Sequence, residues 1–135
     1  MIYSTHSAEE TKAVAAQFAA TLHGGEVIAL IGDLGAGKTT FVQGLAQVLG
    51  ATTGAKSPTF TLMNIYPTNH PTIHRLVHLD FYRVNDGTHL GLEDYKTNDT
   101  VILAEWPDNK TIGPATHTIT MTAGPGPTDR TIEIV

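Results

Sequence analysis

The sequence has no cysteine among its 135 residues, and it has no long apolar run. Without cysteine, disulfides, thiolate metal sites and a cysteine nucleophile are excluded. The longest wholly apolar stretch, Val27–Ile31, is far shorter than the roughly 20 residues that a membrane-spanning helix needs. Residues 1–6 also lack the basic and apolar regions of a signal peptide. We therefore expect a protein that works in the cytoplasm and does not enter a membrane.

Charge is scarce as well. Charged residues make up 16% of the chain, and eight Lys and Arg face thirteen Asp and Glu, which gives a net charge of −5. A protein that binds nucleic acid by itself usually presents a basic face, so the acidic balance argues against this class. The 41% of hydrophobic residues suits a folded core rather than a disordered tail. At this length the sequence predicts one domain, residues 1–135.

The first half of the chain contains two helical patterns around a strand pattern. Ser7 and Glu10 have the spacing of a capping box, and the apolar face that follows predicts a helix ended by Gly24-Gly25. Residues 27–31 predict a strand buried on both faces, as in a parallel sheet. A second amphipathic helix follows the glycine-rich loop at 32–39 and is expected to stop at Gly50.

Strand patterns dominate the second half. Residues 59–66 and 73–79 predict the two strands of a hairpin, a short helix is expected around 90–95, and 101–104 predicts a buried strand. Residues 116–122 and 130–135 alternate apolar and polar positions, which predicts a terminal antiparallel pair. The whole order predicts an α/β fold, with a mostly parallel central sheet flanked by helices and an antiparallel C-terminal hairpin.

A complete phosphate-binding motif lies between the first buried strand and the second helix. The motif G-x-x-x-x-G-K-[ST] is matched at every fixed position by Gly32, Asp33, Leu34, Gly35, Ala36, Gly37, Lys38 and Thr39. Glycines let backbone N–H groups turn toward anionic oxygens, and the start of the helix adds its positive dipole end. In such a loop Lys38 reaches the β- and γ-phosphates and the Thr39 hydroxyl ligates Mg²⁺. The motif predicts a nucleotide site of the P-loop NTPase type.

Two carboxylates are candidates for the acidic group that a P-loop needs beside its metal. Glu105 directly follows the buried run 101–104, and Asp80 directly follows 73–79. Acids at the C-terminal edge of a parallel sheet lie next to the P-loop, where Mg²⁺ would be held. Glu105 is the first candidate because the apolar run before it is cleaner.

Other classes of P-loop protein can be compared with these residues. Residues 109–112 begin the guanine-recognition motif N-K-x-D but end in Ile112, which disfavours a GTPase. A self-sufficient kinase for a small metabolite usually has an arginine-bearing lid, and this chain has only three arginines. A module that binds ATP passively does not explain two acids at strand ends. The small-metabolite kinase stays the alternative to an ATPase.

Three histidines, His70, His74 and His78, recur every four residues ahead of Asp80. On a strand His74 and His78 would lie about 13 Å apart, too far to share one metal ion. We therefore interpret the three as polar residues on the open face of a hairpin.

Beyond the P-loop, four more segments follow in order along the chain. They are residues 56–62 (KSPTFTL), 78–83 (HLDFYR), 90–95 (LGLEDY) and 102–107 (ILAEWP). Together with the P-loop, extended by Thr40, they resemble the TsaE (YjeE) family, the P-loop ATPases of bacterial tRNA threonylcarbamoyladenosine synthesis. The resemblance covers nearly the whole chain.

This resemblance implies an ATPase that uses ATP/ADP and Mg²⁺ and works with two partners, TsaB and TsaD. TsaD is expected to transfer threonylcarbamoyl to N6 of adenosine 37 in tRNA. The TsaE-like chain is expected to dock on the TsaB–TsaD pair and to reset it between turnovers, so that it meets tRNA only through the complex. We expect slow hydrolysis by the chain alone.

The resemblance also implies roles for single residues. Thr39 and Glu105 would hold Mg²⁺, and Asp80 would act in hydrolysis. The Ser57-Pro58-Thr59 loop would sense the γ-phosphate, since order and release on hydrolysis suit such a switch.

Partner contacts are the second set of implied roles. Trp106 would belong to the working surface of the complex. Tyr82 and Arg83 form either a polar partner surface or a solvated turn, and the sequence leaves both possibilities open.

The adenine pocket has no motif of its own. By resemblance, the base lies between the start of the first helix, near Ser7 and Ala8, and the C-terminal hairpin around Asp129 and Arg130. The guanidinium of Arg130 suits stacking on a purine. An ordinary surface arginine is the alternative.

Overall fold

The computed structural model describes residues 1–33, 35–51, 63–80, 92–105 and 114–135. Within these ranges the elements are β1 (Ile2–Thr5), α1 (Ala8–Ala19), β2 (Val27–Ile31), α2 (Lys38–Val48), β3 (Met63–Pro67), β4 (Arg75–Asp80), the 3₁₀ helix η2 (Leu92–Tyr95), β5 (Thr100–Glu105), β6 (His117–Ala123) and β7 (Arg130–Ile134).

The described strands form one mixed sheet in the order β1-β7-β6-β2-β5-β4-β3. Its centre is parallel, because β2 pairs in parallel with both β5 and β6, and β5 pairs in parallel with β4. Both sides are antiparallel: β7 pairs with β6 and β1 with β7 on one side, and β3 pairs with β4 on the other. The α/β fold with a parallel centre and an antiparallel C-terminal hairpin is thus confirmed.

Strand β1 is an element that the sequence pattern does not predict. It has four residues and forms the edge next to β7, with Ile2 opposite Glu133 and Thr5 opposite Arg130. A run this short shows too few alternations to be recognised, and its partner lies at the other end of the chain.

Helix α1 begins as the capping box predicts and ends earlier than expected. The Ser7 side chain accepts a hydrogen bond from the Glu10 N–H at 3.1 Å. After Ala19 the N–H groups of Thr21 and Leu22 bond the carbonyls three residues back, Phe18 and Ala19. This tighter turn satisfies the last carbonyls of the helix and ends it before the two glycines.

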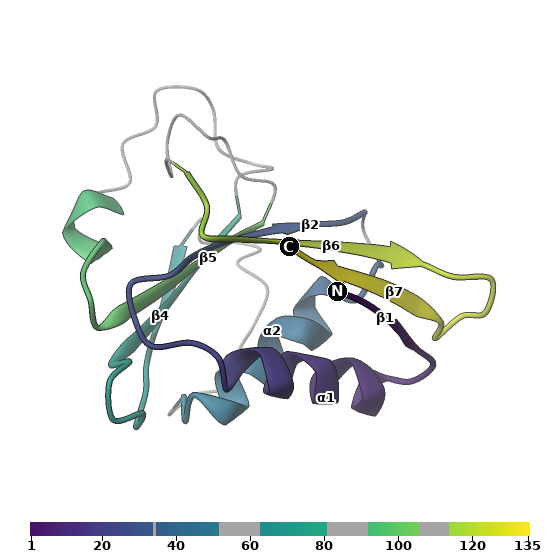
Figure 1. Ribbon diagram of the computed structural model, residues 1–135, viewed down its shortest axis with the longest axis horizontal. Coiled ribbons are helices and arrows are strands. Elements are labelled where there is room, and N and C mark those ends of the chain that lie inside the picture. Colours follow the sequence, from purple (N-terminus) through teal and green to yellow (C-terminus); the bar gives the residue numbers. More distant parts are fainter. Residues whose placement is uncertain (34, 52–62, 81–91, 106–113) are drawn as a thin grey trace.

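Both α-helices lie on the same face of the sheet, below it in Figure 1. Helix α1 packs against α2, where the rings of Phe18 and Phe41 are 6.3 Å apart. The sheet contributes to the same cluster fully buried residues such as Leu76, Leu103 and Ile119. A smaller apolar cluster, to which Tyr95 of η2 adds its ring, covers the other face of β4 and β5 with Val77, Leu79, Ile102 and Ala104.

The middle of the chain partly follows the expected pattern. The predicted hairpin is present as β3 and β4, and the expected helix near 90–95 is the 3₁₀ helix η2. Residues 59–62 of the first predicted strand lie outside the described ranges. In the part of the chain that is described, no helix has the length and apolar character that a bilayer crossing requires.

Candidate phosphate-binding site

The glycine-rich loop connects the C-terminal end of β2 to the first residue of α2. Gly35 and Gly37 have φ values of 80° and 94°, the left-handed region that glycine enters without a steric cost. Gly37 is the N-cap of α2, and no side chain caps this helix. No capping side chain therefore competes with an anion for the start of α2.

Neighbouring elements hold this loop in place. Ala36 is buried in the core, and its N–H donates to the Asp33 carbonyl at 3.0 Å. A Cβ on Gly32 would lie 2.8 Å from the Met121 carbonyl of β6, so only glycine fits there. The loop is consequently set against β6 before any ligand arrives.

Behind the loop lies a buried cluster of ionisable side chains formed by Lys38, Glu105 and His78. Lys38 and Glu105 are 7% and 5% exposed, and their Nζ and Oε1 atoms are 3.6 Å apart. His78 Nε2 donates to the other carboxylate oxygen, Oε2, at 2.6 Å. Burying charge is costly unless it is paired, so these contacts account for the positions of all three side chains.

Strand geometry explains why the cluster forms. Glu105 is the last residue of β5, and the parallel pairing with β4 sets it opposite Asp80. Side chains alternate along a strand, so Leu76 and His78 share the helix-covered face of β4, as Leu103 and Glu105 share that of β5. The candidate acids therefore stand at the C-terminal edge of the sheet, next to the P-loop.

His78 corrects one expectation. It was expected on the open face of a hairpin, and it is fully buried on the helix side of the sheet. His74 is mostly exposed and lies 3.4 Å from Asp99, so it belongs to a different surface. The described residues contain no group of three or more potential metal-ligating side chains of the His, Cys, Asp and Glu types.

The sequence pattern contains a feature that could have placed His78 in the site. In residues 75–80, positions 76 and 78 share a strand face, and Leu76 is an evident core residue. A histidine next to it on that face needs a buried partner, and only the pairing with β5 supplies Glu105.

Oxygen donors at the site fit a hard divalent cation. Thr39 lies in the first turn of α2, followed by Thr40, and both are half-buried. A threonine hydroxyl and a carboxylate are the ligand types that Mg²⁺ prefers, alongside phosphate oxygens and water. Thr39 and Glu105 could hold such an ion, and Lys38 could contact a phosphate.

Several residues of the predicted site belong to segments outside the described part of the chain. Leu34 of the loop lies outside the described ranges, as does the switch segment with Ser57 and Thr59. The residues expected at the partner surface, Tyr82, Arg83 and Trp106, lie outside them as well.

The two segments expected around the base are brought together. His6, which precedes the Ser7 cap and Ala8 of α1, has its Nδ1 2.9 Å from Asp129 Oδ1. Thr128 donates its hydroxyl to the His6 carbonyl at 2.7 Å. The hydrogen bond and charge of Asp129 raise the pKa of His6, and the same hydrogen bond is the main cause that lowers the pKa of Asp129.

Arg130 connects this corner to the P-loop. Its Nε lies 3.4 Å from the position that a Cβ on Gly37 would take. Its Nη1 donates to the carbonyls of Pro127 and Asp129, at 3.1 and 2.7 Å. The buried Nε has no hydrogen-bond partner within the described ranges. The guanidinium is thus held beside the loop by backbone carbonyls.

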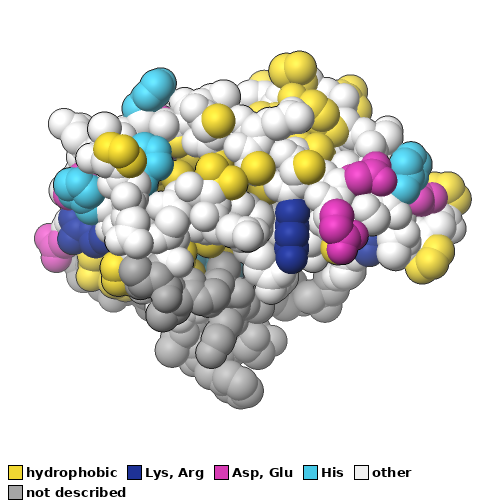
Figure 2. Space-filling view, turned by 90° about the horizontal axis from the view of Figure 1, so that it is seen from below, with side chains coloured by type: hydrophobic (Ala, Val, Ile, Leu, Met, Phe, Trp, Pro, Cys, Tyr) yellow, Lys and Arg dark blue, Asp and Glu magenta, His cyan; other side chains and the backbone are white. Residues whose placement is uncertain are grey.

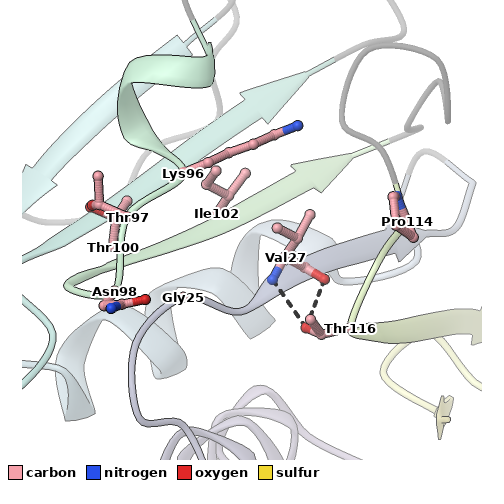
Figure 3. A pocket seen from close by; sticks show the side chains of 9 residues that line it. All are labelled: Gly25, Val27, Lys96, Thr97, Asn98, Thr100, Ile102, Pro114 and Thr116. Carbon is pink, nitrogen blue, oxygen red and sulfur yellow. Dashed lines mark hydrogen bonds between the residues drawn. The ribbon is translucent and has the colours of Figure 1, made fainter.

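A hollow of about 320 Å³ opens at the opposite edge of the sheet. Figure 3 shows it at the N-terminal ends of β2 and β5, where Thr116 makes two hydrogen bonds to the backbone of Val27. Lys96, Thr97 and Asn98 lie along its other side. The parallel strands separate this hollow from the P-loop, so it does not belong to the candidate site.

The fold and the site define a P-loop protein: a mixed β-sheet with a parallel centre, a glycine-rich loop leading into an uncapped helix, and a buried carboxylate on the neighbouring strand. The family model described as "Threonylcarbamoyl adenosine biosynthesis protein TsaE" matches residues 5–132. The chain therefore belongs to the TsaE family.

Individual relatives agree with this assignment. The chain is 45% identical over 105 residues to the tRNA threonylcarbamoyladenosine biosynthesis protein TsaE of Bacillus subtilis, which covers 77% of this chain and 65% of the relative. It is 49% identical over 82 residues to the TsaE protein of Aquifex aeolicus, 59% of each. The match therefore spans about three fifths of the length of these relatives.

The crystal structure of Bacillus subtilis YdiB has a similar fold. The two structures superpose with a TM-score of 0.75 at 34% sequence identity, covering 98% of this chain and 82% of YdiB. The expected fold class and family are thus both confirmed.

Proposed function

We propose that this chain is a Mg²⁺-dependent ATPase that sustains the tRNA threonylcarbamoyladenosine modification at position 37. The observation that carries the proposal is the buried contact between Lys38 and Glu105 behind the uncapped start of α2. A lysine and a carboxylate held there are the two charged groups that a phosphate chain with its cation needs. The similar proteins of Bacillus subtilis and Aquifex aeolicus are named for tRNA threonylcarbamoyladenosine biosynthesis, which supports a role in this pathway.

In this proposal each side chain has a defined task. Lys38 leaves Glu105 and binds the β- and γ-phosphates, while Thr39 and Glu105 hold the cation. Bound Mg²⁺ neutralises developing charge on the phosphates. Asp80, opposite Glu105 on β4, orients the attacking water. Ser57 and Thr59 sense the γ-phosphate.

We further propose that the chain works through TsaB and TsaD homologues in the cytoplasm and meets tRNA only within their complex. The net charge of −5 supports this, because free tRNA binding needs a basic surface. Figure 2 shows the face formed by α1 and α2, and on its described part the Lys and Arg side chains do not gather into a patch.

The decisive experiment is reconstitution of modified tRNA over many turnovers with TsaB and TsaD homologues. The Lys38→Ala variant should give little more product than omission of the chain, because phosphate binding loses its main cation. Lys96 is an exposed lysine at the far edge of the sheet, so Lys96→Ala is the matched control and should retain the wild-type yield of modified tRNA.

Steady-state ATP hydrolysis by the same proteins completes the test. We expect slow hydrolysis by the isolated chain and faster hydrolysis with both partners. Vigorous turnover without partners, or full tRNA modification with Lys38→Ala, would contradict the accessory role. Phosphoryl transfer to a small metabolite would instead favour the kinase alternative.

A further inference from the structure

His78 is a buried polar side chain that forms a hydrogen bond with Glu105. Its side chain is fully buried, and Nε2 meets Glu105 Oε2 at 2.6 Å. The other ring nitrogen, Nδ1, has no hydrogen-bond partner among the described residues. Because the carboxylate can only accept, Nε2 carries the proton in this contact. Burying an imidazole beside core residues such as Leu76 is unfavourable unless a hydrogen bond compensates for the lost water. The hydrogen bond to Glu105 provides this compensation.

The same contact divides the two oxygens of Glu105 between two partners. Oε2 is occupied by His78, and Oε1 lies 3.6 Å from Lys38 Nζ. The terminal torsion of a glutamate is broad and roughly two-fold, so an unrestrained carboxylate would sample several orientations. With one oxygen fixed by a buried ring, the other is directed toward the P-loop.

We propose that His78 is a positioning residue that holds the Glu105 carboxylate with Oε1 facing the P-loop lysine and the cation site. This inference rests on the proposed function, in which Glu105 is a Mg²⁺ ligand. His78 itself touches neither the nucleotide nor the ion. It acts by removing the orientational freedom of the carboxylate, as hydrogen-bonded outer groups do around metal ligands.

The test measures how Mg²⁺ changes ADP binding, by titrating ADP at a series of Mg²⁺ concentrations and without Mg²⁺. His78→Leu fills the core space with a side chain that cannot donate. We expect it to raise the half-saturating Mg²⁺ concentration by roughly 10- to 100-fold, with ADP binding in the absence of Mg²⁺ changed by less than about twofold. A role in folding alone would change both quantities together.

Conservative variants separate the hydrogen bond from packing. The amide nitrogen of glutamine can take the place of Nε2, whereas that of asparagine falls nearer to Nδ1. His78→Gln should therefore restore the Mg²⁺ dependence to within a few-fold of wild type, and His78→Asn should not. This pair also decides the question if His78→Leu does not fold. The exposed His74→Leu is the matched control and should behave as wild type.

Combining His78→Leu with Glu105→Gln tests whether His78 acts through Glu105. In the Glu105→Gln protein, His78→Leu should add no further loss of Mg²⁺ dependence. An additional loss of similar size, or wild-type Mg²⁺ dependence in His78→Leu and His78→Asn, would overturn the proposal. If wild type itself binds ADP with no response to Mg²⁺, the proposed function fails, and this inference fails with it. A Mg²⁺ response in wild type that all His78 variants retain removes only the inference.

Discussion

At the scale of single residues, Glu105 is the member of the buried cluster that contacts both of the others. Both of its carboxylate oxygens face nitrogen donors that are themselves buried, Lys38 Nζ and His78 Nε2. Removing one member of such a group leaves an uncompensated buried charge or polar atom, which costs about 3–5 kcal/mol for an ion pair. The stability of this buried cluster therefore depends on the same carboxylate that the proposed function assigns to the cation.

The sequence predicts two members of this cluster. Lys38 belongs to the P-loop motif, and Glu105 directly follows a buried strand. The prediction for His78 is wrong because the spacing of the histidines along the chain does not show that Glu105 lies beside it on the neighbouring strand. A buried hydrogen bond between side chains 27 positions apart is created by the β4–β5 pairing. No local spacing encodes it.

The His6–Asp129 contact gives a prediction for single residues. Asp129 raises the pKa of His6 above its ordinary 6.5. The contact therefore stabilises the folded state fully below pH 6.5, as long as Asp129 stays ionised, and is lost as pH rises through the raised pKa. Asp129→Asn should lower the His6 pKa toward its ordinary value. NMR titration of the His6 ring, assigned with His6→Gln, measures it.

The contribution of Asp129 to stability has the opposite pH dependence to that of His6. Asp129 has a lowered pKa, so its contribution is present above its ordinary pKa and disappears as pH falls through the lowered one. The ring signals of the other histidines should not respond to Asp129→Asn. A His6 titration curve that stays the same in this variant would show that the contact is not formed in solution.

At the scale of elements, periodicity predicted every described strand and helix except β1. Long or strongly patterned segments such as β2, α1 and α2 were recognisable because one face or the whole element is buried. Their ends were less certain. The end of α1 is decided by hydrogen bonds of Thr21 and Leu22 to carbonyls in the last turn, and the glycines that follow only permit the chain to turn away.

The packing of α1 on α2 depends on a glycine inside a helix. A Cβ at Gly44 would lie 2.8 Å from the Lys12 Cα and 3.0 Å from its carbonyl oxygen, both backbone atoms. Gly44→Ala gains about 1 kcal/mol of helix propensity, but forcing apart a packed backbone costs typically 1–3 kcal/mol. We expect the strain to prevail and the free energy of unfolding to fall by about 1 kcal/mol, measured by urea denaturation.

Gln43→Ala is the control for the same helix. Gln43 is exposed, so its replacement should change the unfolding free energy by no more than about 0.5 kcal/mol. If Gly44→Ala were as stable as Gln43→Ala or more so, the close approach of the two helices would not be rigid.

At the scale of the whole molecule, the two segments expected around the base come from opposite ends of the sequence. His6 and the turn with Thr128 and Asp129 are more than 120 residues apart, yet two hydrogen bonds join them. The β1–β7 and β6–β7 pairings bring these segments beside the P-loop. This explains why a local motif predicts the phosphate site and no local motif predicts the base site: the expected phosphate contacts lie in one loop, whereas the segments expected around the base meet only in the folded sheet.

Arg130 allows the base site to be tested apart from the phosphate site. Its guanidinium lies beside Gly37 and is held by the Pro127 and Asp129 carbonyls, which suits stacking on a purine. Arg130→Ala should weaken ADP binding by roughly 3- to 30-fold, the equivalent of a cation–π contact of about 0.7–2 kcal/mol. Calorimetric titration with ADP and with inorganic tripolyphosphate, which has no base, distinguishes the two sites.

Binding of tripolyphosphate should change by less than about twofold, because Lys38 and the α2 N-terminus still bind it. An equal loss for both ligands would mean that Arg130 supports the P-loop through its position beside Gly37, and the purine would then have to lie elsewhere.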